Sequence, residues 1–247
     1  MPSSGRIGAY PEGAARLGMR IVAVSDLHGN LPKTPACDLL IVAGDVCPDR
    51  AAGRHARDRP ELQANWVREV FFPWIAEAGA ERSVLTWGNH DWCGMSAVEA
   101  RRLVADAPAG ATVLVDALLS VPDGTSAVSV WASPWSNQFM NWAFMKTPGE
   151  LAEVYAAIPP GTDIVVSHQP PHGFGDRFVD VITGRIEHLG SRELLATIER
   201  VRPKMVVCGH IHDGHGRYIH AGVPIYNVSI VNEQYRRVYQ PTVIELS

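Results

Sequence analysis

The sequence predicts a layered α/β fold, and two observations support that prediction. Short runs of apolar and β-branched residues alternate along the chain with segments of helical periodicity, which is the pattern of α/β proteins. The 247-residue chain is also 46% hydrophobic and 19% charged, so it has enough apolar surface to bury a large core. Because no linker or repeat divides the chain, we expect a single domain over residues 19–247, preceded by a flexible arm over residues 1–18.

Ten segments have the composition of β-strands, with four to six mostly apolar residues in each. Seven of them are Arg20–Ser25, Leu39–Ala43, Ser83–Trp87, Thr112–Val115, Ala127–Ala132, Asp163–Ser167 and Met205–Cys208. Three late segments with hairpin-like spacing are Tyr218–Ala221, Pro224–Ser229 and Thr242–Leu246. These strands, with helices between them, make up the predicted layers.

Three helices are expected between the strands. The first has one apolar face, because apolar residues recur every four positions and again one step over. They are Leu62, Trp66, Val70, Trp74, Val67, Phe71 and Ile75. Pro73 should kink or end this helix. Ser96 and Glu99 form a capping-box pattern that begins the second helix, and Ser191 begins the third.

Charge and cysteine content exclude several classes of protein. The net charge of −4 provides no basic field for a phosphate backbone, so stable nucleic-acid binding is not expected. The four cysteines (37, 47, 93 and 208) show no C-x-x-C spacing, which indicates reduced thiols and a cytoplasmic location. No apolar stretch approaches the ~18 residues of a membrane span, so no membrane partner is expected.

Five short polar motifs stand at or directly after the ends of expected strands. They are Asp26-Leu27-His28, Gly44-Asp45, Gly88-Asn89-His90-Asp91, Ser167-His168 and Gly209-His210-Ile211-His212. Loops at such strand ends converge on one edge of a parallel sheet. In an extended backbone, residues two apart point to the same side, so Asp26 with His28, and His210 with His212, can each reach one small volume. Carboxylate, imidazole and amide groups together suit divalent Mn, Fe or Zn.

Each motif has a simpler explanation when it is taken alone. A Gly-Asp pair is usually a turn, a D-x-H motif often begins a loop, and a histidine pair can lie on the surface. Their conjunction favours a metal site, because all five occur in order, each at a strand end. Asp91 has two interpretations, a residue that orients its neighbours or a solvent-facing turn residue, and the first is favoured.

The order of these motifs resembles the calcineurin-like metallophosphoesterase superfamily, over about Ser25 to Asp213. Three stretches, Trp131–Phe144, His168–Phe174 and Cys208–Gly216, are similar to the subgroup named for metallophosphoesterase-domain proteins, which includes brain-enriched vertebrate members. The resemblance implies a four-layer α/β/β/α sandwich with a dinuclear metal site at the strand ends. The metals implied are Mn and/or Fe, with Zn or Mg as alternatives.

The resemblance also implies a role for each motif residue. The first metal would be held by Asp26, His28, Asp45 and His212, and the second by Asp45, Asn89, His168 and His210, with Asp45 as the bridge. His90 would not be a ligand; it would stabilise the phosphoryl group or protonate the leaving oxygen, and Asn89 would also touch the phosphate. Vertebrate relatives lack the last histidine of G-H-x-H, which is present here as His212, so full metal occupancy is expected.

The chemistry of such a site needs no protein nucleophile. Two cations ~3.5–4 Å apart clamp phosphoryl oxygens and lower the pKa of a bridging water, which becomes the nucleophile. We therefore interpret the cysteines near the motifs as small core residues.

Aromatic residues crowd the stretch from Trp131 to Phe144 with the period of neither a strand nor a helix, which favours a loop. Trp131, at a strand end, is expected in the core. We hypothesise that Trp135 and Phe139 help form the wall of a nucleotide pocket, because aromatic rings stack on bases.

The function predicted is the metal-dependent hydrolysis of a small phosphodiester, with a cyclic nucleotide as the favoured substrate. The alternative is a nucleotide-binding regulatory protein with weak residual phosphodiesterase activity. A nuclease and a phosphoprotein phosphatase are less favoured, the former because of the acidic net charge. The expected partner is a small phosphate ester or nucleotide. The sequence is compatible with a homo-oligomer as well as with a monomer.

Overall fold

The computed structural model describes residues 18–48, 50–51, 54–55, 59–180 and 183–247. The flexible arm expected over residues 1–18 lies outside these residues, apart from Gly18. None of the helices in the described ranges has the length and apolar character that a membrane crossing requires.

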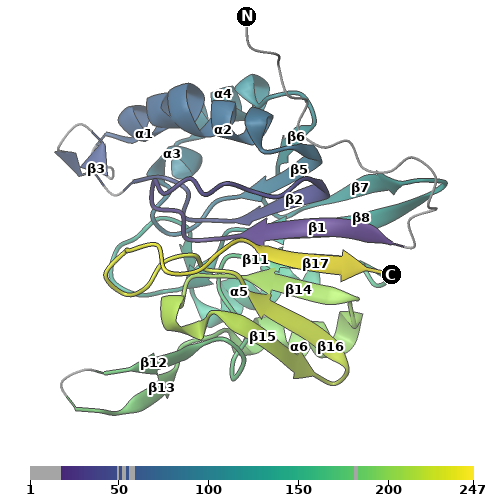
Figure 1. Cartoon of the computed structure of the whole chain (residues 1–247). Coiled ribbons are helices and arrows are strands. Elements are labelled where there is room, and N and C mark those ends of the chain that lie inside the picture. The colour runs from purple at the N-terminus through teal and green to yellow at the C-terminus, as the bar shows by residue number, and fades with distance from the viewer. Residues whose placement is uncertain (1–17, 49, 52–53, 56–58, 181–182) are drawn as a thin grey trace, which may run out of the picture.

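Two mixed sheets form the centre of the molecule (Figure 1). The first sheet has the order β17 (Thr242–Leu246), β1 (Met19–Val24), β2 (Cys37–Ala43), β5 (Ala80–Thr86) and β6 (Ala111–Val113). Its strands β1, β2, β5 and β6 are mutually parallel, and β17 runs antiparallel to β1.

The second sheet has the order β15 (Gly216–His220), β16 (Val223–Asn227), β14 (Met205–Cys208), β11 (Ile164–Ser167), β8 (Ser126–Ser133) and β7 (Ala117–Asp123). Its four inner strands are parallel, while β15 and β7 are antiparallel edge strands. Three short ribbons complete the strands: β3 (Arg50–Ala51) with β4 (Arg54–His55), β9 (Ser136–Asn137) with β10 (Met145–Lys146), and β12 (Arg177–Val179) with β13 (Ile186–His188).

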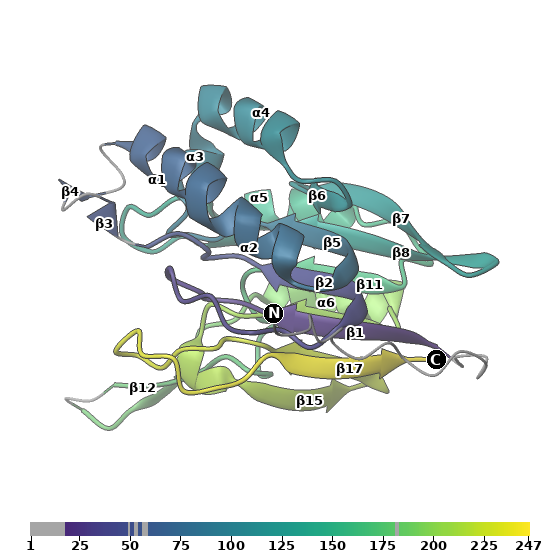
Figure 2. The same cartoon turned by 45° about the horizontal axis from the view of Figure 1, so that its top comes forward.

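Helices cover the outer face of each sheet. The first sheet is covered by α1 (Pro60–Trp66), η2 (Val67–Phe71), α2 (Phe72–Glu77), α3 (Trp92–Met95) and α4 (Ala97–Asp106), and Figure 2 shows α1, α2 and α4 lying over its strands. The second sheet is covered by α5 (Pro148–Ala156) and α6 (Arg192–Val201). A 3₁₀ turn, η3 (His212–Gly214), follows β14.

Three apolar clusters hold these layers together, and the strand period of two explains them. On β1, Ile21 and Ala23 pack between the two sheets, whereas Val22 and Val24 pack under the first set of helices. A third cluster joins the second sheet to α5 and α6 through residues such as Leu151. Because both faces of the inner strands are buried, these strands are continuously apolar. The predicted four-layer α/β/β/α sandwich is confirmed.

The first predicted helix does not end at Pro73. It runs on to Glu77, and its middle, Val67–Phe71, is π-helical. Pro73 has no N–H to donate to the fourth residue before it, and the wider π turn directly before the proline accommodates that missing donor. The predicted N-caps are confirmed, since Ser96 and Ser191 each accept a backbone N–H from the third residue on.

Several elements were not predicted, among them α3, α5, β7 and the short pairs β3/β4, β9/β10 and β12/β13. Helix α5 begins with a complete capping box of Thr147 and Glu150, a pattern that is visible in the sequence. Strand β7 contains Pro122 and half-exposed residues, as befits an edge strand, where a proline needs no ladder hydrogen bond.

Candidate metal centre

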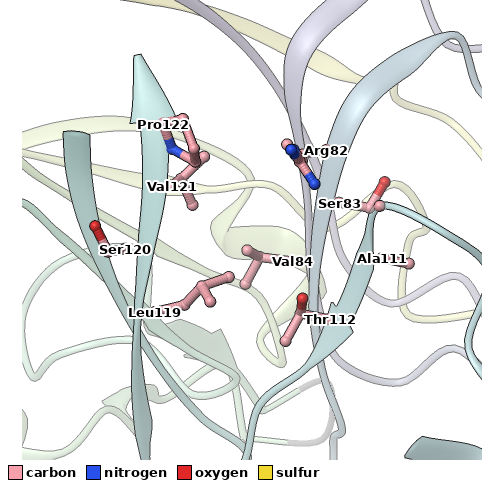
Figure 3. Close-up of a pocket in the computed structure, with 10 residues that line it drawn as sticks. Arg82, Ser83, Val84, Ala111, Thr112, Leu119, Ser120, Val121 and Pro122 are labelled. Atoms are coloured by element: carbon pink, nitrogen blue, oxygen red, sulfur yellow. The ribbon is translucent and has the colours of Figure 1, made fainter. Parts of the chain in front are cut away.

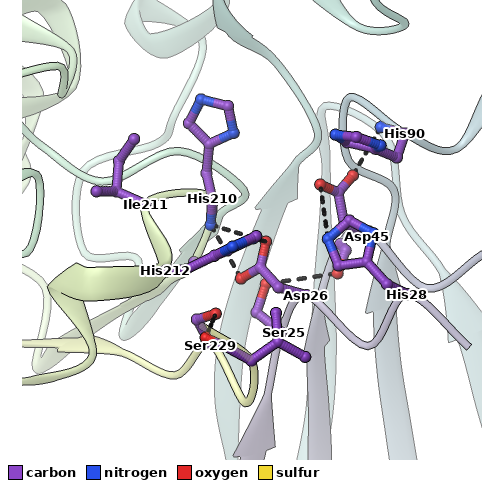
Figure 4. A network of polar contacts seen from close by, with 12 residues as sticks. Ser25, Asp26, His28, Asp45, His90, His210, Ile211, His212 and Ser229 are labelled. Atoms are coloured by element: carbon purple, nitrogen blue, oxygen red, sulfur yellow. Dashed lines mark hydrogen bonds and ion pairs between the residues drawn. The ribbon is translucent and has the colours of Figure 1, made fainter. Parts of the chain in front are cut away.

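The five polar motifs follow five parallel strands, β1, β2 and β5 of the first sheet and β11 and β14 of the second. Their carboxyl ends lie at the same end of the sandwich, so the loops meet there. The sequence predicted one sheet edge, whereas the structure combines the edges of two facing sheets. Figure 4 shows the resulting cluster, with the loops after β1 and β2 facing the loop after β14.

One group of three candidate ligands lies at the loop after β1. Asp26, His28 and His212 each offer one ligand atom, and these atoms lie within 4.8 Å of one another. The His212 Nε2 to Asp26 Oδ1 distance is 3.6 Å, with both side chains nearly inaccessible to solvent. The Nδ1 of His212 lies 3.1 Å from the carbonyl of Asn232. Because a carbonyl can only accept, Nδ1 carries the proton and Nε2 is left to bind a cation.

A second group lies beside the first. Asp45, His168 and His210 also bring their ligand atoms within 4.8 Å of one another. His168 is oriented as His212 is, because its Nδ1 donates to the carbonyl of Ala43 at 2.9 Å, which leaves Nε2 facing Asp45 Oδ2 at 3.2 Å. The Asn89 Oδ1 lies 2.9 Å from His168 Nε2 and 2.8 Å from His210 Nδ1, so the amide oxygen points into this group.

Asp45 connects the two groups. Its Oδ2 lies 3.8 Å from His28 Nε2 in the first group and 3.2 Å from His168 Nε2 in the second. Its Oδ1 accepts the backbone N–H of His90 at 2.8 Å. The carboxylate is buried, so it faces the candidate ligands rather than water.

The backbone of this cluster is not extended, contrary to the prediction for residues two apart. Asp26, His28, Asp45 and His210 have φ values of 55°, 42°, 51° and 67°, in the left-handed region where such residues cost about 1–3 kcal/mol each. Hydrogen bonds between loops hold them there: Asp26 N–H donates to Gly44 O at 3.0 Å, and His28 N–H donates to Asp45 O at 2.9 Å. The side chains therefore converge through tightly curved loops.

Two glycines of the motifs make the close approach possible. A Cβ at Gly88 would overlap Asp45 Oδ1, and one at Gly209 would overlap the Ser25 hydroxyl and the Asp26 carboxylate. The glycines thus let the backbone of one loop pack directly on the carboxylate of another.

Asp91 is buried and acts as an acceptor for the loops. Its carboxylate accepts the backbone N–H groups of Val46 at 3.2 Å, Cys47 at 2.9 Å and Gly88 at 2.9 Å. It thereby ties the loop that carries Asp45 to the loop that carries His90. Burial, followed by repulsion from Asp45, raises the pKa of Asp91 to about 6 against the opposing effect of the three donors.

Charge is unevenly shared within the cluster. Burial opposes the ionisation of Asp26, but contact with His212 outweighs it and lowers the pKa of Asp26 to about 2. Burial likewise opposes the protonation of His168, but the charge of Asp45 raises the pKa of His168 to about 9. Burial and repulsion from His168 lower the pKa of His210 to about 3. Without cations, the cluster therefore balances its carboxylates with a proton on His168.

The donor set fits two divalent cations. Two buried carboxylates, four imidazoles and one amide oxygen form two adjacent groups with Asp45 between them. Mixed oxygen and nitrogen donors of this kind suit Mn, Fe or Zn.

His90 lies beside the cluster but in neither group. Its ring centroid is 4.8 Å from that of His28 in an edge contact and 4.4 Å from that of Trp142 in a stacked contact. The Gln63 side chain fixes the loop that carries His90, because its Nε2 donates to the His90 carbonyl at 2.8 Å.

The predicted aromatic wall residues are placed differently. Trp135 packs between the core clusters, and its Nε1–H donates to Asp116 Oδ2 at 2.6 Å. Phe139 is 62% exposed. The aromatic residues that contact the histidines are Trp142, in the same stretch, and Tyr235. Trp142 lies in the aromatic stretch that the sequence singles out, but Trp135 and Phe139 were the residues selected there, and Tyr235 belongs to no sequence motif.

Two further features of the described residues lie outside the cluster. The four cysteines are buried and none of them forms a disulfide, with Cys47 Sγ and Cys93 Sγ 3.7 Å apart, which agrees with the interpretation of those near the motifs as core residues. A pocket of about 330 Å³ lies between β5, β6 and β7 (Figure 3). Its lining residues, among them Ser83, Thr112 and Ser120, do not belong to the cluster.

Comparison with known proteins places these observations in context. A family model described as calcineurin-like phosphoesterase matches residues 19–214. The metallophosphoesterase domain-containing protein 1 of Homo sapiens and that of Mus musculus are each 29% identical over an alignment of 247 residues, which covers 92% of this chain and 71% of each relative. Among solved structures, the phosphopantetheinyl hydrolase of Mycobacterium tuberculosis is similar with a TM-score of 0.57 at 14% identity, covering 93% of this chain and 96% of that one. At that identity the likeness concerns the fold alone.

Proposed function

The chain belongs to the calcineurin-like phosphoesterase family, and from that premise we propose that it hydrolyses a small phosphodiester, with a cyclic nucleotide as the favoured substrate. The observation that carries the proposal is the position of Asp45 between two groups of buried ligands. A carboxylate shared in this way suits two cations held side by side. One cation would be held by Asp26, His28 and His212. The other would be held by His168, His210 and Asn89.

Two bound cations would neutralise charge on the phosphoryl oxygens and activate the attacking water. The protein's own residues then have two tasks. The Asn89 amide, directed into the second group, would hold the phosphoryl group in place. His90 would supply a proton to the leaving oxygen, because its ring lies at the edge of the cluster and its backbone is anchored to Asp45 and Gln63.

The proposal is tested by restoring metal to chelator-treated protein. Mn is titrated into the protein, and hydrolysis of bis-p-nitrophenyl phosphate is followed together with that of 2′,3′- and 3′,5′-cyclic nucleotides. Metal-dependent turnover of at least one diester supports the enzyme. Tight nucleotide binding without turnover would instead favour the regulatory alternative.

The proton-donor role is tested with His90→Ala. A general acid contributes about 10²–10⁴ in rate, mainly for poor leaving groups. We expect the variant to keep its metals, to lose most turnover of a cyclic nucleotide and to lose less on p-nitrophenyl esters, whose leaving group hardly needs a proton. Equal losses on both substrates would contradict the acid role and leave charge stabilisation.

A further inference from the structure

Two aromatic side chains from distant parts of the sequence flank His90. Trp142 comes from the loop between β9 and β10, and Tyr235 from the segment between β16 and β17, beyond the last residue that the family model matches. The Trp142 ring contacts His90, the Tyr235 ring contacts His28 as well, and both rings remain partly open to solvent, with Trp142 36% and Tyr235 42% exposed. An aromatic ring in that position is available to a ligand.

Trp142 is fixed against the site by the backbone on either side of it. The next residue, Ala143, donates its N–H to the carbonyl of Asn89 at 3.0 Å, which joins the aromatic loop to the loop that carries His90. Pairing between β9 and β10 closes the base of the loop. The Trp142 ring consequently stacks on His90 at 4.4 Å between centroids, with 30° between the planes.

Tyr235 is fixed by a tight turn built on Asn232. The Asn232 carbonyl accepts the Tyr235 N–H at 2.8 Å, and its side-chain oxygen accepts the N–H of Arg236 at 3.0 Å. Tyr235 itself has a φ of 57°, a conformation that a tyrosine keeps only where its surroundings impose it. The same Asn232 carbonyl accepts His212 Nδ1, so the turn is attached directly to a candidate ligand.

The Tyr235 ring contacts three histidines of the site. Its centroid is 4.6 Å from that of His28, 5.4 Å from that of His212 and 6.0 Å from that of His90, all in edge contacts. Tyr235 and Trp142 therefore both contact His90. The ester group of a phosphate ester whose phosphoryl group occupies the ligand cluster would reach these two rings where it extends past His90.

We propose that Trp142 and Tyr235 form an aromatic pair that selects phosphate esters with a planar ring, such as a nucleobase, by stacking on that ring. The inference rests on the proposed function, since it assigns the phosphoryl group to the cluster. It differs from the wall of Trp135 and Phe139 predicted from the sequence. Stacking on an aromatic side chain contributes roughly ten- to a hundredfold in affinity per base.

The test measures binding rather than turnover, with Mn-loaded protein and three probes: 5′-AMP, ribose 5-phosphate and inorganic phosphate. All three offer a phosphate, and 5′-AMP alone offers a base. We expect wild-type protein to bind 5′-AMP about ten- to a hundredfold more tightly than ribose 5-phosphate. Trp142→Ala and Tyr235→Ala should each weaken 5′-AMP binding by about tenfold or more and leave the other two dissociation constants within about twofold. Tyr235→Phe, which keeps the ring, should behave as wild type.

Matched controls come from the same two loops. Met140 and Val238 are exposed apolar residues there, so Met140→Ala and Val238→Ala should leave all three constants unchanged. Phe139→Ala tests the wall predicted from the sequence, and a selective loss of 5′-AMP binding in that variant alone would overturn the aromatic pair. Thermal melts of each variant exclude unfolding as the cause.

Failure of this inference differs from failure of the proposed function. If phosphate binds and a diester is hydrolysed, yet 5′-AMP binds no more tightly than ribose 5-phosphate, the aromatic pair is wrong and the proposed function stands. If Trp142→Ala weakened the binding of all three probes equally, the Trp142 ring would position His90 and would not stack on a base. If no probe binds with Mn present and no diester is cleaved, both are overturned.

Discussion

At the scale of single residues, Asp45 contacts histidines of both ligand groups. One carboxylate oxygen faces His28 and His168, and the other accepts the His90 N–H. Burial opposes its ionisation, but His168 and His90 hold the pKa of Asp45 well below its usual range. The group is therefore an anion placed between two sets of candidate metal ligands.

Replacement of Asp45 should remove more bound metal than replacement of any other candidate ligand. We expect Asp45→Ala to lose both cations, because one carboxylate serves both groups, whereas His28→Ala affects the first group alone. Metal content after dialysis, measured by mass spectrometry, checks this. Asp163→Ala, a change at a partly exposed ion pair with Lys204, is the control and should keep both. Two bound metals and normal turnover in Asp45→Ala would refute the dinuclear arrangement.

His168 makes the stability of the metal-free protein depend on pH. Its pKa rises from 6.5 to about 9 on folding, so the folded chain holds this proton more tightly than the unfolded chain. The resulting stabilisation is complete below pH 6.5 and is lost as the pH rises through 9. We expect the melting temperature in the presence of a chelator to fall over that range. This decrease should be absent from His168→Gln. A melting temperature of the wild-type protein that does not change with pH over that range would contradict the raised pKa of His168.

At the scale of elements, buried polar side chains hold the loops after the strands in place. Asp91 accepts N–H groups from the loops after β2 and β5, whereas Asn227 at the end of β16 is a donor to the loop after β14. The Asn227 Nδ2 donates to the carbonyls of Gly175, Gly209 and Ile211 at 2.9–3.2 Å. These contacts explain how ligand residues persist in left-handed conformations.

Truncation of Asp91 should destabilise the fold strongly. Asp91→Ala leaves three buried N–H groups without their acceptor, and each such loss costs about 1–3 kcal/mol. We expect a decrease in the free energy of unfolding of about 3 kcal/mol or more, measured by urea denaturation. Asp106→Ala is the matched control, because Asp106 pairs with Arg68 at the surface and such pairs contribute about 1 kcal/mol or less. A similarly small effect in both variants would show that Asp91 is dispensable.

At the scale of the whole molecule, the site joins two sheets that also meet through apolar packing and through backbone hydrogen bonds between Ser25 and the segment after β16. Asp26 comes from the first sheet and His210 from the second, 184 positions later, yet the His210 N–H donates to the Asp26 carboxylate at 3.0 Å. Cations that bind both sides would hold the sheets together. Metal binding is thus coupled to the stability of the complete sandwich.

Metal should raise the melting temperature of the whole chain in one step. A ligand at a hundredfold excess over its dissociation constant stabilises the folded state by about 2.7 kcal/mol, or about 5–10 °C for a chain of this size. We expect that increase when Mn is titrated into chelator-treated protein and followed by calorimetry. Asp45→Ala should show little or none of it. An equal increase in that variant would indicate that Mn binds elsewhere.

Local sequence pattern is enough to predict the α/β layers and the candidate residues of the site. Strand periodicity, the capping residues Ser96 and Ser191, and the polar motifs at strand ends depend on neighbours in the chain, so they are visible without a structure. The predicted ligands that the structure brings together, among them Asp26, Asp45 and His168, all belong to those motifs.

How these residues meet depends on tertiary packing. The convergence of two sheet edges, the left-handed backbone at Asp26 and His210, and the three donors to Asp91 depend on contacts between segments far apart in sequence. Tyr235 shows this most clearly. Its segment has no periodicity and no motif, and it reaches the histidines because the turn at Asn232 packs against His212. Local pattern selects elements and donor types, whereas packing between layers selects which side chains share a volume.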